Sequence, residues 1–432
     1  MRGYSTGSWA ALVVAALAFV PGEAGGQTTV ELRDAVDRAL ARSPQLAQAE
    51  NALLNAETTR KTAKGSFLPT VSTSAGATIQ SSSQFDPTLG QLESSTSNST
   101  RASISANYSL FEGGQRFYDL QRSEADVGAA SARLENQRYQ VIFQTKGLFF
   151  AALATGDLLR VARAREDRAQ QGLEIVERQV QLGSGTRSDL LRAQLELANS
   201  RQGVLQAEAS DRAARFALGR QIGLGEPVSP SVPDGIGPRP LPLGEEEVFV
   251  LAEEASPSVE AAALAVESAD AGIKSSRTSY IPSVGMSGGY GWNNGEWALA
   301  DGRTSWSVSF NASYPIFQGF TRSVGVQRAR ESYRVAQLQE VDARLAARQE
   351  ADRALQGLRT AEQAIAIALE SVGVAEEDLR VITERYRVGV GIILDVLASQ
   401  IALTEAEAGL VQARFDYEIA WADLESILGR EL

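Results

Sequence analysis

An internal repeat constrains the fold of this 432-residue chain most strongly, because two copies of one pattern are expected to fold into two similar halves. Residues of the same type recur at a constant offset of 206 positions. The pairs are Phe111 and Phe317, Gly113 and Gly319, Gln121 and Gln327, Gly183 and Gly389, Asp189 and Asp395, Leu191 and Leu397, and Gln194 and Gln400. Earlier in each copy, Ser43-Pro44 and Ser256-Pro257 match at an offset of 213. We therefore predict two repeats, residues 27–222 and 245–432.

Each repeat contains two segments in which apolar residues alternate with small polar ones. The clearest runs from Ser305 to Ile316, and the other three begin at Val71, Ala102 and Val284. A period of two places residues of one kind on one face of a strand, so we predict β-hairpins at residues 66–112 and 279–317. The offset between the copies is 213 before the hairpins and 206 after them, so the first hairpin is longer than the second. We place the extra residues in its loop and predict a longer loop in the first hairpin, Ser81 to Thr100, than in the second, Asn293 to Arg303.

Helical segments surround each hairpin. We expect an opening helix at residues 30–64 and 245–277, and a long proline-free helix at residues 115–182 and 321–388. A helix of about 68 residues reaches roughly 100 Å. Tight turns at residues 183–188 and 389–394 then lead into returning helices. The opening and returning helices, laid end to end, match the long helix, and heptad spacing from Leu403 to Leu424 predicts that the helices pack side by side.

Two further segments stand outside the repeats. Residues 1–26 carry Arg2, an apolar run from Trp9 to Val20 and small residues at the end, which predicts a signal peptide for export. An uncleaved anchor is the alternative, but the run is shorter than the roughly 20 residues of a spanning helix. Residues 223–244 hold six of the 13 prolines, which indicates a linker or a short belt around the rod that the packed helices would form.

Composition excludes several classes of function. The net charge of −12 argues against a nucleic-acid partner. Cysteine and histidine are both absent, which removes disulfides, Cys/His zinc sites, the commonest general base and an acylated N-terminal cysteine. Because Asp and Glu are plentiful only on helix faces, we expect no enzyme, no cofactor and no metal site, and no lipid anchor.

The four strands cannot close a barrel alone, and lipid does not tolerate an open sheet edge. Two chains would give eight strands around a filled interior, whereas three would give twelve strands around a pore. The Ser-, Thr- and Asn-rich face favours a pore, so we predict a trimeric α+β membrane protein with a 12-stranded transmembrane barrel. Aromatic residues near the strand ends suit the membrane interface; they are Phe111, Phe317, Trp292 and Trp306. A soluble periplasmic coiled-coil adaptor or structural protein is the alternative, but it leaves the alternating hairpins unexplained.

The chain resembles the TolC-type outer-membrane efflux proteins. The resemblance rests on the repeated layout, on Leu110 to Gly114 and Pro315 to Gly319 after the strands, and on Tyr386 to Gly389 followed by Asp395 to Leu397. It implies a homotrimer in the outer membrane of a Gram-negative bacterium, with a helical barrel in the periplasm. It also implies a passive exit duct for small molecules or secreted proteins, which works with a periplasmic adaptor and an inner-membrane transporter.

The resemblance also implies roles for the two turns. Asp395 would line the narrow periplasmic entrance, where a ring of three carboxylates favours cations. The local alternative is N-capping, which we favour for Asp189 and leave open for Asp395. A link from Tyr386 to Asp189 would hold the entrance shut. Gly391 and Ala398 replace a gating Arg and a second Asp of a well-known member, so Arg187 or Arg387 are expected substitutes. Adaptor contact would fall on the turn glycines, which are Gly183, Gly185, Gly389 and Gly391.

Overall fold

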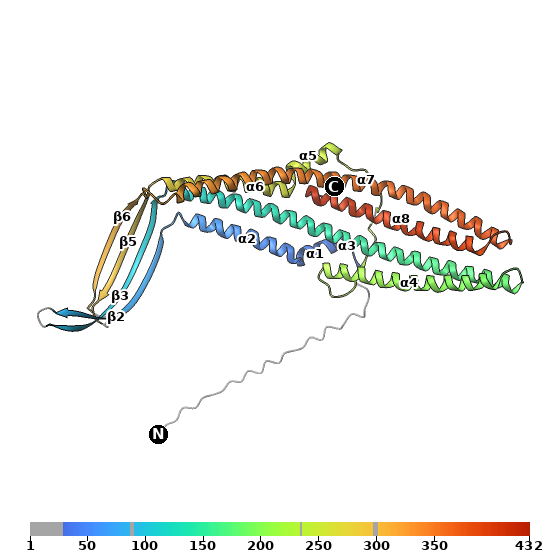
Figure 1. The fold of residues 1–432 in the computed structure, drawn as a ribbon, viewed down its shortest axis with the longest axis horizontal. Coiled ribbons are helices and arrows are strands. Elements are labelled where there is room, and N and C mark those ends of the chain that lie inside the picture. The colour runs from blue at the N-terminus through green and yellow to red at the C-terminus, as the bar shows by residue number, and fades with distance from the viewer. Residues whose placement is uncertain (1–28, 87–89, 234–235, 297–300) are drawn as a thin grey trace, which may run out of the picture.

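The computed structural model describes residues 29–86, 90–233, 236–296 and 301–432. The predicted signal peptide, residues 1–26, lies outside the described residues. The described chain is a long rod of helices with a sheet at one end and two helical turns at the other (Figure 1). The sheet and the turns are therefore separated by the full length of the rod.

The helices follow the same order in each half of the chain. The first half contains α1 (Leu32–Arg42), α2 (Pro44–Gly65), α3 (Gln115–Gln181) and α4 (Arg187–Gln221). The second half contains α5 (Glu245–Ala255), α6 (Pro257–Arg277), the short 3₁₀ helix η1 (Thr278–Tyr280), α7 (Thr321–Arg387) and α8 (Ile393–Leu428). Helices α3 and α7 each run through 67 residues without a break, as their proline-free sequences predict. No helix among these combines the length and the apolarity needed to cross a membrane.

The expectation of one continuous opening helix was wrong in both halves. The chain leaves the helical conformation at Ser43, where φ is −70° and ψ is 120°, and at Ser256, where φ is −67° and ψ is 139°. Pro44 and Pro257 follow, and proline disfavours a helical conformation in the residue before it. Proline lacks an N–H group but fits the first helical position, so a new helix starts there. The Ser43 hydroxyl caps it by accepting the N–H of Leu46 at 3.2 Å.

Four strands form one antiparallel sheet in the order β2-β3-β5-β6. The strands are β2 (Thr70–Asp86), β3 (Gln91–Phe111), β5 (Ser283–Asn294) and β6 (Arg303–Ser313). Pairing of β3 with β5 joins the two hairpins into this sheet, and leaves β2 and β6 as its edges. Two short strands, β1 (Thr29–Val30) and β4 (Ser229–Pro230), pair in parallel elsewhere.

The pairing register aligns residues of one kind across all four strands. On one face, the hydroxyls of Ser72 and Ser105 lie 2.9 Å apart, and those of Ser287 and Ser309 lie 2.7 Å apart. On the other face, Ile104 is opposite Tyr290, which is opposite Trp306. The large apolar side chains of this second face are exposed in the single chain. They include Val71, Ile79, Ile104, Tyr290, Trp306, Val308 and Phe310.

The predicted long loop in the first hairpin was wrong. Strands β2 and β3 continue to pair as far as Asp86 and Gln91, so most of Ser81 to Thr100 is strand. This stretch is rich in Ser and Thr, and β2 meets no proline between Pro69 and Pro87. Nothing therefore interrupts the ladder, and threonine favours the extended conformation. The first hairpin extends well beyond the second at the end of the sheet far from the helices (Figure 1).

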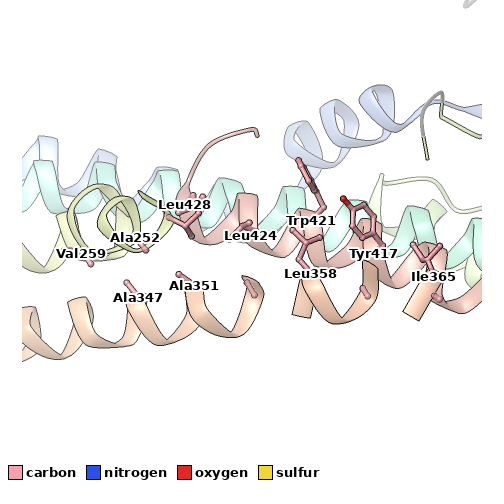
Figure 2. Close-up of a cluster of buried hydrophobic side chains, with 14 residues drawn as sticks. Ala252, Val259, Ala347, Ala351, Leu358, Ile365, Tyr417, Trp421, Leu424 and Leu428 are labelled. Atoms are coloured by element: carbon pink, nitrogen blue, oxygen red, sulfur yellow. The ribbon is translucent and has the colours of Figure 1, made fainter. Parts of the chain in front are cut away.

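Small residues of α7 let the helices of the second half pack closely. Ala347, Ala351 and Ala354 share one buried cluster with Tyr417 and Trp421 of α8 (Figure 2). Short side chains on one helix allow a small distance between helix axes and leave room for the large aromatic rings of the other. A second cluster joins α1, α3 and α4 around Phe149 and Leu218. These two clusters hold the middle of the rod together.

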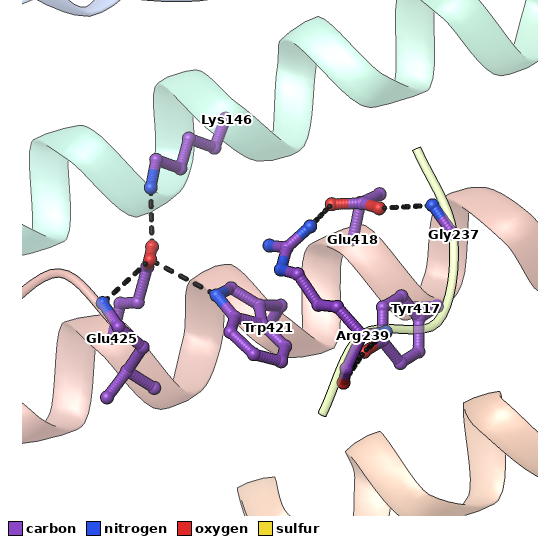
Figure 3. Close-up of polar contacts among 8 residues, drawn as sticks. Lys146, Gly237, Arg239, Tyr417, Glu418, Trp421 and Glu425 are labelled. Atoms are coloured by element: carbon purple, nitrogen blue, oxygen red, sulfur yellow. Dashed lines mark hydrogen bonds and ion pairs between the residues drawn. The ribbon is translucent and has the colours of Figure 1, made fainter. Parts of the chain in front are cut away.

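Residues of the 223–244 segment are fixed to α8 by a partly buried polar network (Figure 3). The N–H of Arg239 donates to the Tyr417 hydroxyl at 3.0 Å, and the hydroxyl donates back to the Arg239 carbonyl at 3.1 Å. The Arg239 guanidinium pairs with the buried Glu418 carboxylate at 3.2 Å and lies 4.0 Å from the centre of the Trp421 ring. Ionised groups are costly to bury unless they are paired, so these contacts tie the segment to one position on α8.

Candidate functional site at the helical turns

The two turns at the end of the rod have the same backbone geometry. In the first, the N–H of Gly183 donates to Val180 O at 3.1 Å and the N–H of Ser184 to Gln179 O at 2.9 Å. In the second, Gly389 donates to Tyr386 O at 3.0 Å and Val390 to Arg385 O at 2.9 Å. This pair of bonds ends a helix with a left-handed residue.

Glycine is required at the left-handed position of each turn. The φ angle is 79° at Gly183 and 82° at Gly389, values that residues with a Cβ atom rarely adopt. At Gly185 and Gly391, an added Cβ would lie 3.0 Å from the backbone nitrogen of Val180 or of Tyr386. The four glycines predicted as tip residues are therefore explained by the tight turns that they make.

Asp189 is engaged in capping helix α4. Thr186 is the N-cap residue, and its hydroxyl accepts the N–H of Asp189 at 3.1 Å. The Asp189 carboxylate in turn accepts the Thr186 N–H at 3.1 Å and the Thr186 hydroxyl at 2.7 Å. This reciprocal capping box satisfies N–H groups that the first helical turn leaves unpaired. It also places a negative charge at the positive end of the helix.

Asp395 occupies the same position of α8 but makes none of these bonds. The N-cap residue there is Ile392, which has no side-chain acceptor, and α8 has no side-chain cap. The Asp395 side chain is exposed, and among the described residues it has no hydrogen-bond or ion-pair partner. One of the two aspartates therefore presents a free carboxylate at the tip.

Tyr386 lies in the apolar core between the two turns. It is 7% exposed and packs with Val176, Ala193 and Ile393. Its hydroxyl has no partner within the described chain, so the predicted link to Asp189 is not formed. The Asp189 carboxylate is instead used in the cap. Burial raises the pKa of the Tyr386 phenol, and the nearby negative charge of Asp189 raises this pKa further.

A cavity of about 140 Å³ lies beside Tyr386, between α3, α7 and α8. Arg168 also lines it, and its Nε, like the Tyr386 hydroxyl, is a buried polar atom without a partner in the described chain. The other nitrogens of Arg168 are engaged, because they bind the Glu407 carboxylate at 2.8 and 3.0 Å. Two buried polar atoms of the described chain, the Tyr386 hydroxyl and the Arg168 Nε, therefore lie without a partner on the inner side of the tips.

The structure places the two predicted arginines differently. Arg387 forms an ion pair with Glu384 one turn earlier, at 3.3 Å on the exposed helix surface. Arg187 is exposed at the first position of α4 and is in none of the ion pairs of the described residues. Among the described residues, neither arginine forms a hydrogen bond or an ion pair with Asp189, Asp395 or Tyr386.

The predicted interface aromatics lie at the sheet and at its junction with the helices. Trp306 is 76% exposed on the apolar face, Phe317 is exposed after β6, and Phe111 is exposed at the end of β3. Trp292 is half-buried and aligned with Ala102 and Thr304. Of these four aromatic residues, Trp306, Phe317 and Phe111 are exposed on the surface of the chain, and Trp292 is partly covered.

Two junction arginines were missed by the sequence analysis. Arg116 donates to the carbonyls of Ser109 at 2.6 Å and Ser66 at 3.2 Å, which ties α3 to strand β3 and to the C-cap residue of α2. Arg322 lies over the rings of Tyr280 and Tyr314 at the second hairpin. The two arginines match at the same offset of 206 residues, so the repeat itself could have identified them.

Comparison with known proteins places this geometry in a family. The model of the outer membrane efflux protein family matches residues 35–224 and 248–430. Protein CyaE of Bordetella pertussis is 28% identical over 382 residues, which are 85% of this chain and 77% of that protein. Outer membrane efflux protein BepC of Brucella suis is 23% identical over 336 residues, which are 76% of this chain and 71% of that protein.

The fold is also found in a crystal structure. The outer membrane protein VceC from Vibrio cholerae has a TM-score of 0.78 to this chain, with 18% sequence identity. The match covers 93% of this chain and 96% of that one, so sheet, rod and turns are shared. The family match covers most of both halves of the chain, and it confirms the resemblance drawn from the sequence. The chain belongs to the outer membrane efflux protein family.

Proposed function

We propose that three copies of this chain form one passive exit duct across the outer membrane. Twelve strands would make a transmembrane barrel, and the duplicated helices would continue it as a helical barrel in the periplasm. The observation that carries this proposal is the four-stranded sheet, which has one apolar face, one hydroxyl-lined face and two open edges. No other layer of the described chain covers either face.

The open edges favour assembly with other copies. Strands β2 and β6 each leave one row of backbone N–H and C=O groups without a strand partner. Such edges are costly in lipid, and closure into a barrel removes them. The two edge strands run in opposite directions, so β6 of one copy can pair with β2 of the next in the same antiparallel pattern. Three copies give a barrel wide enough for a water-filled pore.

The helical rod also presents surfaces suited to neighbouring copies. Leu338, Val341 and Leu345 form an exposed apolar stripe on α7, and Leu191 and Leu195 are exposed on α4. Residues three and four apart lie on one face of a helix. One stripe therefore lies in each half of the chain, and lateral contact with neighbouring copies would bury both.

The free carboxylate of Asp395 supports its role at the periplasmic entrance. Three copies would bring three such carboxylates together, which would attract cations and repel anions. Arg187, exposed on the neighbouring turn, is available for contacts between copies. The exposed tips around Gly183, Gly185, Gly389 and Gly391 would receive the periplasmic adaptor, which connects the duct to an inner-membrane transporter. The duct would carry out no chemistry, and residues 1–26 would be removed on export.

Paired lysine substitutions on opposite faces of β6 test the proposal. Val308 lies on the apolar face and Ser309 on the polar face, as the pairing register shows. A lysine facing lipid near the bilayer centre costs about 2–4 kcal/mol, whereas a lumen substitution is tolerated. Val308→Lys is therefore expected to reduce the yield of membrane-inserted trimer strongly, and Ser309→Lys to leave it near the wild-type level. Trimers would be counted by light scattering after detergent extraction. Equal effects of both substitutions, or a chain released without detergent as a monomer, would contradict the proposal.

A further inference from the structure

The part of the sheet that contains all four strands carries charge in one row only. The pairing register aligns Gly76 with Arg101, Arg101 with Asn293, and Asn293 with Arg303. From this row to the helical end of the sheet, the four described strands contain no other charged residue. Both charges in the row are positive, in a chain whose net charge is −12.

Both arginines lie on the hydroxyl-lined face. Two residues along each strand toward the helices, the register aligns Ser103, Gly291 and Ser305. A Cβ placed on Gly291 would lie 3.7 Å from the Ser305 hydroxyl and 3.9 Å from the Ser103 Cβ. Residues two apart in a strand point to the same face. Arg101 and Arg303 therefore share the face of Ser103 and Ser305, opposite the exposed Trp306.

The two guanidiniums can act on one ligand. Adjacent strands are about 4.8 Å apart, so the Cα atoms of Arg101 and Arg303 are separated by about 10 Å across Asn293. Both side chains are exposed, and neither is in an ion pair among the described residues. Glu296 and Asp301, the acidic residues closest along the chain to Asn293 and Arg303, lie between β5 and β6 and form no ion pair with either arginine among the described residues.

The row of Arg101, Asn293 and Arg303 also has a defined position along the strands, and hence a defined depth in the proposed membrane barrel. It is at the end of β5 and β6 that is farthest from the helices, and Arg303 is the first of the 11 residues of β6. A strand of that length spans about 36 Å, which crosses the hydrocarbon core when the strand is tilted. The row thus stands at the outer mouth, at the opposite end of the duct from Asp395.

We propose that Arg101, Asn293 and Arg303 form a binding site for polyvalent anions at the outer mouth, for solutes that carry two or more phosphate groups. The inference rests on the proposed trimeric duct, in which three copies place six guanidiniums and three amides around the pore. The guanidinium fork matches phosphate oxygens, and several forks around one opening select ligands with several phosphates over chloride. The outer mouth favours anions, whereas the carboxylate at the inner entrance favours cations.

Block of single channels by inorganic tripolyphosphate tests the site. Mature wild-type protein is inserted into planar bilayers in about 0.1 M KCl, where the Debye length is about 10 Å. Tripolyphosphate is added to each side in turn, and the concentration that halves the current is measured. We expect the double variant Arg101→Gln with Arg303→Gln to raise this concentration at least about tenfold, and each single variant to raise it about threefold. The wild-type block should weaken in about 1 M KCl, where the Debye length is about 3 Å.

Two control variants separate charge from size. Arg101→Lys with Arg303→Lys keeps both charges without the forks, so it should raise the half-blocking concentration less than the double glutamine variant does. Ser305→Gln places the same amide on the same face two residues farther inward and should leave the block unchanged to within about twofold. If the glutamine variants are blocked like wild type, the anion site is wrong although the duct stands. If wild-type protein forms no conducting channel at all, both proposals are overturned. If the double variant does not assemble, the single variants test the site instead, because each should raise the half-blocking concentration about threefold.

Discussion

The turn after α3 and the turn after α7 share their backbone hydrogen bonds but use their aspartates differently. In the first, Thr186 binds Asp189 in a capping box. In the second, Ile392 takes the place of the threonine, and Asp395 is exposed without a cap. One residue at the N-cap therefore decides whether the carboxylate is held in a capping box or remains unpaired in the described chain.

The largest expected effect of this difference is on the block of the channel by cations. Asp395→Asn removes three charges from the proposed entrance, and we expect the half-blocking concentration of a trivalent cation to rise about tenfold or more. Asp189→Asn is the matched control, since its carboxylate is held in the cap, and it should change the block less than about twofold. Planar-bilayer recording measures both variants. A larger effect at Asp189 than at Asp395 would reverse the comparison.

A threonine at Ile392 should make the second turn resemble the first. In Ile392→Thr the new hydroxyl can accept the Asp395 N–H, and the carboxylate can accept bonds in return. An engaged carboxylate attracts cations less, so block by the same trivalent cation should weaken by a few-fold. Ile392→Val has the same branched shape without the oxygen and should leave the block unchanged. Identical behaviour of the two variants would show that capping does not control the carboxylate.

Removing the cap of the first turn should loosen only that turn. Thr186→Val deletes the hydroxyl that holds Asp189, at a cost of about 1 kcal/mol. This corresponds to roughly fivefold faster amide exchange in the first turn of α4. Hydrogen exchange read by mass spectrometry on peptides from residues 187–192 and 393–398 measures it. The second peptide is the internal control, and faster exchange there would mean that the two turns are coupled.

The smallest effect is expected at Tyr386. Because its hydroxyl has no partner in the described chain, Tyr386→Phe should change the free energy of unfolding by less than about 0.5 kcal/mol near neutral pH. The raised pKa of Tyr386 means that the unfolded chain ionises before the folded one, so the tyrosine costs stability as pH rises above about 10. Tyr386→Phe should lose less stability than wild type in that range.

Thermal unfolding at several pH values measures this difference. Tyr139 is a second tyrosine whose pKa is raised, mainly by burial and next by the charge of Glu135. Tyr139→Phe is therefore a control, which gives the change of stability at high pH for a tyrosine outside the turns. A large loss of stability in Tyr386→Phe at neutral pH would mean that the hydroxyl is bonded in the assembled protein, as the family resemblance implied.

The sequence predicted the large elements because each has a long, uniform pattern. The proline-free runs gave α3 and α7, and strict alternation gave the strands and their two faces. It failed at two single prolines and at one polar stretch without strict alternation. Pro44 and Pro257 divide the opening helices, and the serine- and threonine-rich stretch after Ile79 continues as strand.

The candidate site was predictable in part. The matching glycines and aspartates marked both turns, and the preference for capping at Asp189 agrees with its hydrogen bonds. The contrast with Asp395 lies in the neighbouring Thr186 and Ile392, whose importance appears only once the N-cap position is known. The row of Arg101 and Arg303 depends on the register between strands that are about 200 residues apart, which no local pattern contains.

Disulfide crosslinking between the two edge strands tests the central claim most directly. The natural chain has no cysteine, so only engineered pairs can react. Cysteines at Ser72 or Ser74 of β2 are combined with cysteines at Ser307 or Ser309 of β6, and a bond requires Cα atoms within about 7 Å. Within one chain β3 and β5 separate these strands, whereas the pair Ser103→Cys and Gly291→Cys links neighbouring strands and controls for oxidation. In oxidised outer membranes, we predict that at least one edge pair gives covalent trimers. Monomers for every edge pair, with the control pair oxidised, would contradict the trimeric duct.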